Sequence, residues 1–240
     1  MRLIYIYHSC YVLETERCNI VFDYYRDTGD KRGEGFIHDE LLCDTKPLYV
    51  LSSHVHPDHF NPDVLQWRLK RKNIRYILSK DILNNKRAGA DDAVFLDKGD
   101  EYKDDILHIK AFGSTDVGIS FSLETEGMRI FHAGDLNNWH WMDESTTEEV
   151  AEAEAWYQKE LDDIAKEISW FDLAMFPIDP HLGTDFARGA KEWLSRIPTT
   201  TFVPMHFGEA YDKAAAFGEY VETAGCRYLL PKEKEQSFTI

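Results

Sequence analysis

Short apolar runs recur along the chain and predict β-strands. They are rich in Ile, Val, Tyr and Phe, and several alternate apolar with polar positions, which is the period of a strand with one buried face. We predict strands at LIYIY (3–7), NIVFDY (19–24), LYVLSS (48–53), IRYIL (74–78), ILHIKAF (106–112), GISFSLE (118–124), MRIFHA (128–133), DLAMFPI (172–178) and TTFVPMHF (200–207). The N-terminal segment MRLIYIYHSCYVLE reaches His8 before any long apolar stretch, so it predicts a first strand and not a signal peptide.

Other stretches repeat apolar residues every three or four positions, which predicts amphipathic helices. Asn61 precedes Pro62, the order of a helix cap followed by proline at the first helical position, and a helix is predicted from there to about Lys72. Further helices are predicted over 147–169, 185–196 and 210–224. In the first of these, the following residues form a face that we expect to pack on the core: Val150, Ala153, Tyr157, Leu161, Ile164 and Ile168.

The order of these elements predicts a layered α/β protein with sheets buried between outer helices. A chain of 240 residues is long enough for this, and we expect a single domain over residues 1–240. Hydrophobic residues make up 43% of the chain and charged residues 29%, which is the usage of a folded protein. No apolar stretch reaches the length of a membrane span.

The charge of the chain limits its partners. A formal net charge of −16 argues against nucleic acids, whose affinity for proteins comes largely from Lys and Arg. One basic cluster is expected to be a solvated helix face: Arg68, Lys70, Arg71, Lys72 and Arg75. Four scattered cysteines without a CxxC pair favour the reducing cytoplasm. We expect a small-molecule substrate and no membrane partner, and the sequence leaves a homo-oligomer open.

The strongest chemical signal is the segment His-Val-His-Pro-Asp-His at residues 54–59, directly after the predicted strand 48–53. Three imidazoles and a carboxylate within six residues do not suit a packed core. Imidazole nitrogens and carboxylate oxygens suit Zn²⁺ and related divalent ions, and a proline turn after a strand can direct alternate side chains towards two adjacent ions. The segment therefore predicts a metal centre.

This segment resembles the HxHxDH signature of the metallo-β-lactamase superfamily, and the resemblance extends over nearly the whole chain. FHAGD (131–135) resembles the family's strand that ends in Gly-Asp, VPMHF (203–207) the late strand with the final histidine, and IVFD (20–23) the early strand with a supporting aspartate. The resemblance implies an αββα sandwich with the metal site at the edge where the two sheets meet. More narrowly, YHS (7–9), HAGD, FPI (176–178) and PMH resemble the branch that contains L-ascorbate-6-phosphate lactonase.

The resemblance also implies roles for single residues. His54 and His56 would bind a first metal, Asp135 would bridge both metals, and the second metal would be bound by Asp58, His59 and His206. Asp23 would support the site from behind its ligands. The ions expected are one or two Zn²⁺, with Mn²⁺ as an alternative.

One departure from the family concerns the first metal. The family usually supplies another histidine near the segment AFGSTD (111–116), which contains none. Asp116 is the nearest replacement ligand, either directly or through water, and Ser114 is a weaker one.

Several other residues are candidates for the neighbourhood of the site. His8 lies at a strand end where the resembled branch keeps a histidine near the cleft, and His181 lies in the loop after strand 172–178, so both are candidates for substrate contact. Trp139 and Trp141 either form the wall of a substrate pocket or pack beneath the helix 147–169. The remaining histidines are expected to be structural or exposed: His38, His108, His132 and His140.

Together these features predict a metal-dependent hydrolase. Two ions that share Asp135 would lower the pKa of a water, and the resulting metal-bound hydroxide would attack a carbonyl or phosphoryl group. The resemblance to the family implies that Asp58 is a catalytic residue that orients the nucleophile and carries a proton to the leaving group. The resemblance to the lactonase branch implies a small ester, a lactone or a phosphorylated lactone as the substrate. The alternatives are a phosphodiesterase acting on a small molecule and a metal-binding protein without turnover, the latter because the first-site histidine is missing.

Overall fold

The computed structural model describes residues 1–240 and contains two seven-stranded sheets. The first sheet has the order β14-β1-β2-β3-β4-β5-β6. Its strands are β1 (Arg2–Tyr7), β2 (Cys10–Glu14), β3 (Asn19–Phe22), β4 (Leu48–Ser52), β5 (Ile74–Ser79), β6 (Val94–Leu96) and β14 (Ser237–Thr239). The second sheet has the order β13-β12-β11-β10-β9-β8-β7. Its strands are β7 (Glu101–Lys103), β8 (Leu107–Phe112), β9 (Ser120–Thr125), β10 (Met128–His132), β11 (Phe171–Pro177), β12 (Thr199–Met205) and β13 (Arg227–Tyr228).

Helices connect the strands and cover the sheets. The α-helices are α1 (Phe36–Asp39), α2 (Lys80–Asn84), α3 (Thr147–Glu167), α4 (Arg188–Arg196), α5 (Tyr211–Ala216) and α6 (Gly218–Thr223). Short 3₁₀ helices lie at Leu41–Cys43, Pro62–Leu69 and Pro180–Leu182. None of the helices combines the length and the apolar character that crossing a membrane requires.

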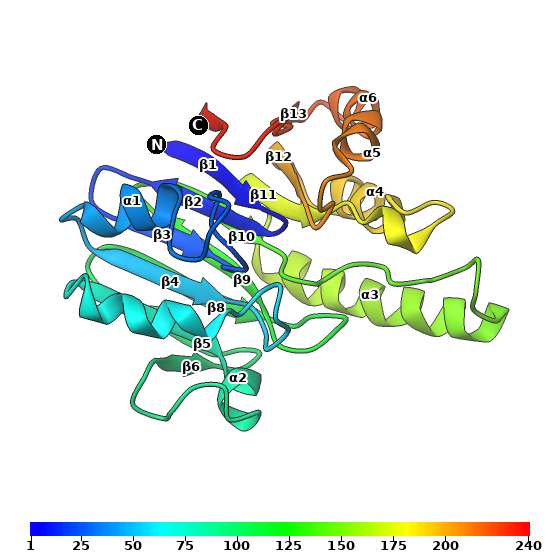
Figure 1. Cartoon of the computed structure of the whole chain (residues 1–240). Helices are drawn as coiled ribbons and strands as arrows, with labels where there is room; N and C mark the ends of the chain where they lie inside the picture. The colour runs from blue at the N-terminus through cyan, green and yellow to red at the C-terminus, as the bar shows by residue number, and fades with distance from the viewer.

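Side chains of the first sheet alternate between two cores, as the period of a strand requires. Leu3 and Leu51 belong to a cluster of 44 buried residues that the second sheet shares, whereas Ile4 and Val50 belong to a separate cluster of 18 on the outer face. The larger cluster also includes Trp193 of α4, on the far side of the second sheet. Figure 1 shows α1 beside β2 and β3, and α3 and α4 on the other side of the molecule. The layers are helix, sheet, sheet and helix, so the predicted αββα sandwich is confirmed.

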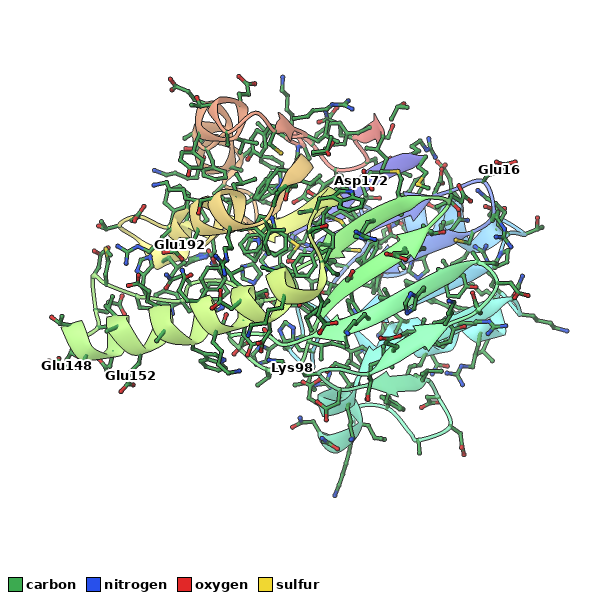
Figure 2. The ribbon with its side chains drawn as sticks, turned by 180° about the vertical axis from the view of Figure 1, so that it is seen from behind. Glu16, Lys98, Glu148, Glu152, Asp172 and Glu192 are labelled. Atoms are coloured by element: carbon green, nitrogen blue, oxygen red, sulfur yellow. The ribbon has the colours of Figure 1, made fainter.

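Helix α3 is the longest helix, and its start follows from the sequence. The Thr146 hydroxyl accepts a hydrogen bond from the Glu149 amide, and the Glu149 carboxylate accepts one from the Thr146 amide. This reciprocal pair satisfies amides that have no partner within the helix. In Figure 2, Glu148 and Glu152 mark the end of α3 that extends beyond the sheets, and Lys98 lies beside the half that packs on them.

Three predicted elements differ from the structure. The segment MRLIYIYHSCYVLE is a hairpin of β1 and β2, not one strand, because His8 turns the chain with a φ of 58°. The helix predicted from Asn61 is a 3₁₀ helix; the Asn61 side chain accepts from the Asp63 amide at 3.0 Å, so the cap itself forms. The helix predicted over 210–224 is divided into α5 and α6, where Gly218, a poor helix former, begins the second.

The basic cluster is not simply a solvated helix face. Arg71 is buried, and its guanidinium donates hydrogen bonds to the carbonyl oxygens of Leu41 and Lys46. Arg68 forms an ion pair with Asp92 at 3.1 Å. The charge of Arg71 is therefore used to hold the segments before β4 together, because a buried guanidinium needs acceptors.

One edge of the sandwich collects the ends of several strands. β3 and β4 are parallel neighbours, as are β10, β11 and β12, so their carboxyl ends point the same way. Polar residues follow within three positions of these ends: Asp23 after β3, His54 after β4, Asp135 after β10, Asp179 after β11 and His206 after β12. Residues far apart in the sequence thereby meet at a single edge.

Candidate metal centre

A first group of possible ligands contains His54, His56, Asp116 and Asp135, whose ligand atoms lie within 4.8 Å of one another. The Asp116 Oδ2 atom is 3.1 Å from His56 Nδ1 and 3.9 Å from His54 Nε2. The segment that lacks the expected histidine thus places a carboxylate beside both imidazoles. Two imidazoles and two carboxylates form a donor set that suits a divalent transition metal.

A second group contains His8, Asp58, His59 and His206, again with ligand atoms within 4.8 Å of one another. The Asp58 Oδ2 atom is 3.3 Å from His8 Nε2, 3.7 Å from His59 Nε2 and 3.8 Å from His206 Nε2. Three imidazole nitrogens around one carboxylate oxygen suit a zinc ion. His8, which the sequence suggested only for substrate contact, belongs to this group.

Asp135 lies between the two groups. Its Oδ2 atom is 3.5 Å from His54 Nε2, and its Oδ1 atom is 3.2 Å from His59 Nε2 and 3.4 Å from His206 Nε2. Its two oxygens therefore face different groups, which is the geometry that a bridging carboxylate needs.

The outer nitrogens of three histidines are held by hydrogen-bond acceptors. His59 Nδ1 is 2.7 Å from Asp23 Oδ2, and His206 Nδ1 is 3.1 Å from Asp179 Oδ2. His54 Nδ1 is 2.9 Å from the Ser53 hydroxyl, which itself donates to Asp23 at 2.6 Å. Since an ionised carboxylate only accepts, this network assigns the proton to each Nδ1 and leaves each Nε2 with a free lone pair directed into the site.

Those inner atoms have no partner within the protein. The buried atoms without a hydrogen bond include the Nε2 atoms of His8, His54, His59 and His206, together with Asp135 Oδ1. Leaving one buried polar atom unsatisfied costs about 1–3 kcal/mol, so an assembly of five is expensive unless something binds there. Divalent cations would satisfy these atoms, since they bind the lone pairs of both imidazole nitrogens and carboxylate oxygens.

Electrostatics within the site point the same way. Burial and the neighbouring His59 lower the pKa of His54 to about 3, so its imidazole is neutral. Burial and the neighbouring Asp135 raise the pKa of Asp116. Burial opposes ionisation of Asp23, but the nearby His132 and His59 outweigh it and lower the pKa of this carboxyl. The repulsion that raises the pKa of Asp116 would be relieved by a bound cation, whose positive charge favours both carboxylates in their ionised form.

The backbone at the site adopts uncommon conformations. His8, Asp23 and His206 have positive φ values of 58°, 43° and 63°. Such residues cost of order 1 kcal/mol each and persist only where the surroundings hold them. The His206 amide donates to the His8 carbonyl at 3.2 Å, and this bond fixes two of the turns against each other.

Close backbone contacts explain two glycines. A Cβ atom at Gly118 would lie 2.1 Å from the Ser53 carbonyl oxygen, and one at Gly134 would lie 2.6 Å from Ser53 Cβ. Both glycines also have positive φ values, of 77° and 54°. Only glycine lets these loops approach the end of β4, where His54 begins the candidate metal-binding segment.

A cavity of about 320 Å³ adjoins both groups. It is lined by Asp58, Thr115, Asp116, Asp135, Trp139, Trp141, Asp179 and His206. The two tryptophans therefore form part of the cavity wall, the first of the two roles considered for them. A cavity of about 380 Å³, which includes Arg129 and Trp170, lies at the opposite end of the strands and shares no residue with either group.

Some residues suggested by the sequence remain outside the two groups. His181 has a side chain that is 81% exposed, and its Nδ1 atom lies 2.7 Å from Asp179 Oδ1 rather than among the cavity residues. His38 and His108 contact Asp27 and Glu101, and His140 contacts the Asp185 carbonyl oxygen, all outside the two groups. His132 is buried against the Ser9 carbonyl oxygen, and its Nδ1 accepts from the Gly134 amide. It therefore shapes the Gly-Asp turn without facing the cavity.

Asp179 is the site residue that sequence reasoning missed. It follows a buried strand directly, in the same way as Asp135 and His54 follow theirs. That position was the available signal, because the carboxyl ends of neighbouring parallel strands lie side by side.

The family of this chain emerges from comparison with known proteins. A family model described as the beta-lactamase superfamily domain matches residues 2–153, more than half of the chain. No curated protein matches the chain. Among solved structures, the chain is similar to Igni18, described as a novel metallo hydrolase from the hyperthermophilic archaeon Ignicoccus hospitalis KIN4/I. The TM-score is 0.72 at 19% identity, and the match covers 100% of this chain and 98% of that chain.

Two further structures share the fold. One, from Veillonella parvula DSM 2008, is described as a possible metal-dependent hydrolase; its TM-score is 0.64 at 12% identity, with 100% of this chain and 99% of that chain covered. The other is CmlA from Streptomyces venezuelae, described as a diiron beta-hydroxylase, with a TM-score of 0.69 at 13% identity. This chain is covered completely by that match but spans only 54% of the CmlA chain. The family model covers more than half of the chain, so the chain belongs to the beta-lactamase superfamily, and its sandwich fold agrees with that of Igni18.

Proposed function

We propose that the chain is a metal-dependent hydrolase that cleaves a small ester or lactone. The observation that carries this proposal is the convergence of four unpartnered Nε2 atoms and one unpartnered carboxylate oxygen beside an open cavity. A purely structural cluster would pair these atoms with one another or with the backbone. Lone pairs that face a common point and a nearby space for substrate are what a catalytic metal site requires.

The residues that would hold the ions follow from the two groups. His54, His56 and Asp116 would bind one ion, with His8, Asp58, His59 and His206 around the other, and Asp135 would contact both. The second set is rich in imidazole and suits Zn²⁺, whereas the carboxylates of the first set also suit Mn²⁺. Iron should be measured together with zinc and manganese, because CmlA, which shares the fold, is described as a diiron beta-hydroxylase.

The bound ions and the Asp58 side chain would have different roles in ester hydrolysis. Bound divalent ions would supply a water of lowered pKa and would polarise the substrate carbonyl. Burial raises the pKa of Asp58, but the neighbouring imidazoles of His8 and His59 outweigh it and hold this pKa well below its usual range. Asp58 is thus ionised, and it lines the cavity. It can accept the proton of the attacking water and deliver it to the leaving oxygen.

The resemblance to the L-ascorbate-6-phosphate lactonase branch makes a phosphorylated lactone the narrower candidate within this substrate class. The experiment is to measure bound zinc, manganese and iron in the purified protein. Turnover of simple esters, lactones, a phosphorylated lactone and a phosphodiester is then measured with and without a chelator. Activity that survives complete metal removal would contradict the proposal. Tight metal binding without turnover of any substrate would favour a binding protein instead.

Asp135→Asn tests the site directly. Because this carboxylate faces both groups, the variant is expected to lose metal and activity together, with kcat/KM at least a hundredfold lower. Asp91→Asn is the matched control, because Asp91 is exposed and lies outside both groups, and it should keep the metal content of the wild type. Full metal stoichiometry and turnover in Asp135→Asn would refute the shared role of this carboxylate.

A further inference from the structure

The cavity beside the metal-binding groups has an unusual lining. Of its eight residues, four are carboxylates (Asp58, Asp116, Asp135 and Asp179), two are tryptophans, and none is Lys or Arg. Two bound divalent ions would offset the negative charge of these carboxylates. No marked positive charge would then remain to attract an anionic group elsewhere on the substrate. A phosphate placed away from the ions would therefore lose its hydration and gain no cation in exchange.

Two basic side chains near the Tyr7 ring are engaged outside the cavity. Arg26 lies over the ring of Tyr7, with its Cζ atom 3.7 Å from the ring centre, and its Nη2 atom is 3.6 Å from the carboxylate of Glu209. Lys234 lies 5.4 Å from the centre of the same ring. Neither side chain is part of the cavity wall.

The two tryptophans form a fixed apolar wall. Trp139 Nε1 donates to the Asp135 carbonyl at 2.8 Å, and the Trp139 ring lies 5.8 Å from the His206 ring. Trp141 stacks on Trp139, with ring centres 6.3 Å apart and planes inclined by 16°. Trp141 is 36% exposed, and its φ is 41°, a conformation that a bulky residue rarely adopts. An exposed indole held in a strained turn beside a ligand cavity indicates a binding surface.

We propose that Trp139 and Trp141 are specificity-determining residues that select a flat, uncharged group of the substrate, such as the aromatic ring of an arylalkyl ester or an aryl-substituted lactone. This inference rests on the proposed hydrolase function. It implies that the phosphorylated lactone suggested by the sequence resemblance is the poorer substrate. The indole faces supply stacking contacts for an aromatic ring, and the cavity lining offers no Lys or Arg to pair with an anionic group.

The test compares esters with leaving groups of similar reactivity. Benzyl acetate, ethyl acetate and 4-(acetoxymethyl)phenyl phosphate would be assayed with the metal-loaded protein. We expect kcat/KM for benzyl acetate to exceed that of ethyl acetate by about tenfold, which is the size of one aromatic stacking contact. It should also exceed that of the phosphorylated ester, which has the same ring, because the phosphate would lose hydration without gaining a cation. Equal values for the benzyl and ethyl esters, or a preference for the phosphorylated ester, would overturn the proposal. If that last preference disappeared in Arg26→Ala, the selective site would be at Arg26 instead.

Tryptophan variants test where the preference for the benzyl ester arises. In Trp141→Ala, the ratio of kcat/KM for benzyl over ethyl acetate should fall about tenfold with metal content retained, and Trp141→Phe should keep most of the preference. Trp156→Ala is the matched control, because Trp156 is 48% exposed on α3 and lies outside the cavity lining. A ratio unchanged in Trp141→Ala, or lowered equally in Trp156→Ala, would refute the proposed subsite.

A binding measurement separates the failure of this inference from that of the proposed function. Titration with 4-nitrobenzyl alcohol should quench the tryptophan fluorescence of the wild type with saturation, and Trp141→Ala should weaken this binding about tenfold. Should no ester be hydrolysed, the hydrolase proposal fails, yet the titration still decides whether the tryptophans bind an aromatic ring. Absence of saturable binding to the wild type would overturn the inference.

Discussion

His56 and Asp116 distinguish the first group of ligands from the second by their exposure. Their side chains are 46% and 35% exposed. In the second group only Asp58 is comparably exposed, at 37%, whereas His59 is fully buried and His206 is 12% exposed. Exposed ligands remain hydrated when no ion is bound, and water can replace them more readily at the ion. The position of the first group is therefore expected to bind its ion more weakly and to remain more open to substrate.

Titration of the metal-free protein should accordingly show one tight and one weaker equivalent. Asp116→Ala should weaken only the weaker equivalent, by about tenfold, because it removes one ligand of the first group. His206→Ala should abolish the tight one. Calorimetric titration with Zn²⁺ measures both. Two equal sites that Asp116→Ala leaves unchanged would show that the assignment of ligands to two positions is wrong.

Gly118 supports the site through a close contact. Alanine there would meet the Ser53 carbonyl oxygen at 2.1 Å and His54 Cβ at 2.5 Å, in addition to its positive φ. Gly118→Ala should therefore destabilise the fold and weaken metal binding. Gly127→Ala is the matched control, since Gly127 has a φ of 81° and no atom within 4 Å of the added carbon. The control should cost about 1–2 kcal/mol of unfolding free energy and keep its metal affinity.

Urea unfolding and metal titration of the two glycine variants check this expectation. Equal losses in both would mean that backbone strain, and not the approach to His54, explains the glycine at position 118.

The sequence indicated the candidate ligand residues more readily than their arrangement. The segment 54–59 could be recognised because its composition alone excludes a packed core. Asp116 could be named as a candidate ligand because the segment 111–116 lacks the histidine that the family usually supplies there. The contact of Asp179 with His206 could not be predicted in the same way, because it depends on the register of β11 against β12, and neither residue's neighbours in sequence reveal it.

Among the secondary-structure elements, length decided what could be predicted. The nine predicted strands all correspond to strands of the structure, because each run is long enough to show a strand-like apolar pattern. The strands β6, β7, β13 and β14 have only two or three residues, too few for a period to show. Their pairing comes from neighbouring strands and not from local sequence.

The start of helix α3 offers a test at this scale. Thr146→Ala removes a hydroxyl that accepts from the Glu149 amide, so we expect a loss of about 1 kcal/mol in unfolding free energy. Thr147→Ala, which changes the adjacent exposed threonine, should cost less than about 0.5 kcal/mol. Denaturant unfolding monitored by circular dichroism compares the two variants. Indistinguishable midpoints would show that the cap does not limit stability.

Across the whole molecule, Asp104 connects the two sheets. Its carboxylate accepts hydrogen bonds from the hydroxyls of Tyr49 in β4 and Tyr102 in β7, both at 2.7 Å, and from the amides of Ile106 and Leu107. Burial raises the pKa of Asp104, but these bonds outweigh it and lower the value to about 2. The ionised form is therefore the one that stabilises the fold.

The lowered pKa of Asp104 makes the stability of the fold depend on pH. A carboxyl whose pKa is lower in the folded state contributes its full stability above its ordinary pKa and loses that stability as the pH falls towards the folded value. Asp104→Asn should thus be less stable than the wild type by about 1 kcal/mol at pH 7, allowing for solvent screening. The difference should shrink between about pH 4 and pH 2. Asp105→Asn, an exposed neighbour, is the control, and a difference that does not vary with pH would contradict the role of Asp104 ionisation.

The hydrogen bond between the backbones of His8 and His206 has a consequence for how the protein matures. During synthesis the ribosome releases His8 near the beginning and His206 near the end, and the second group of ligands is incomplete until β12 has been added beside β11. Joining such distant segments carries a high loop-closure entropy and makes this a late step of folding. A cation can then bind tightly only to a nearly finished chain. We therefore expect metal loading to stabilise the completed fold and not to nucleate it.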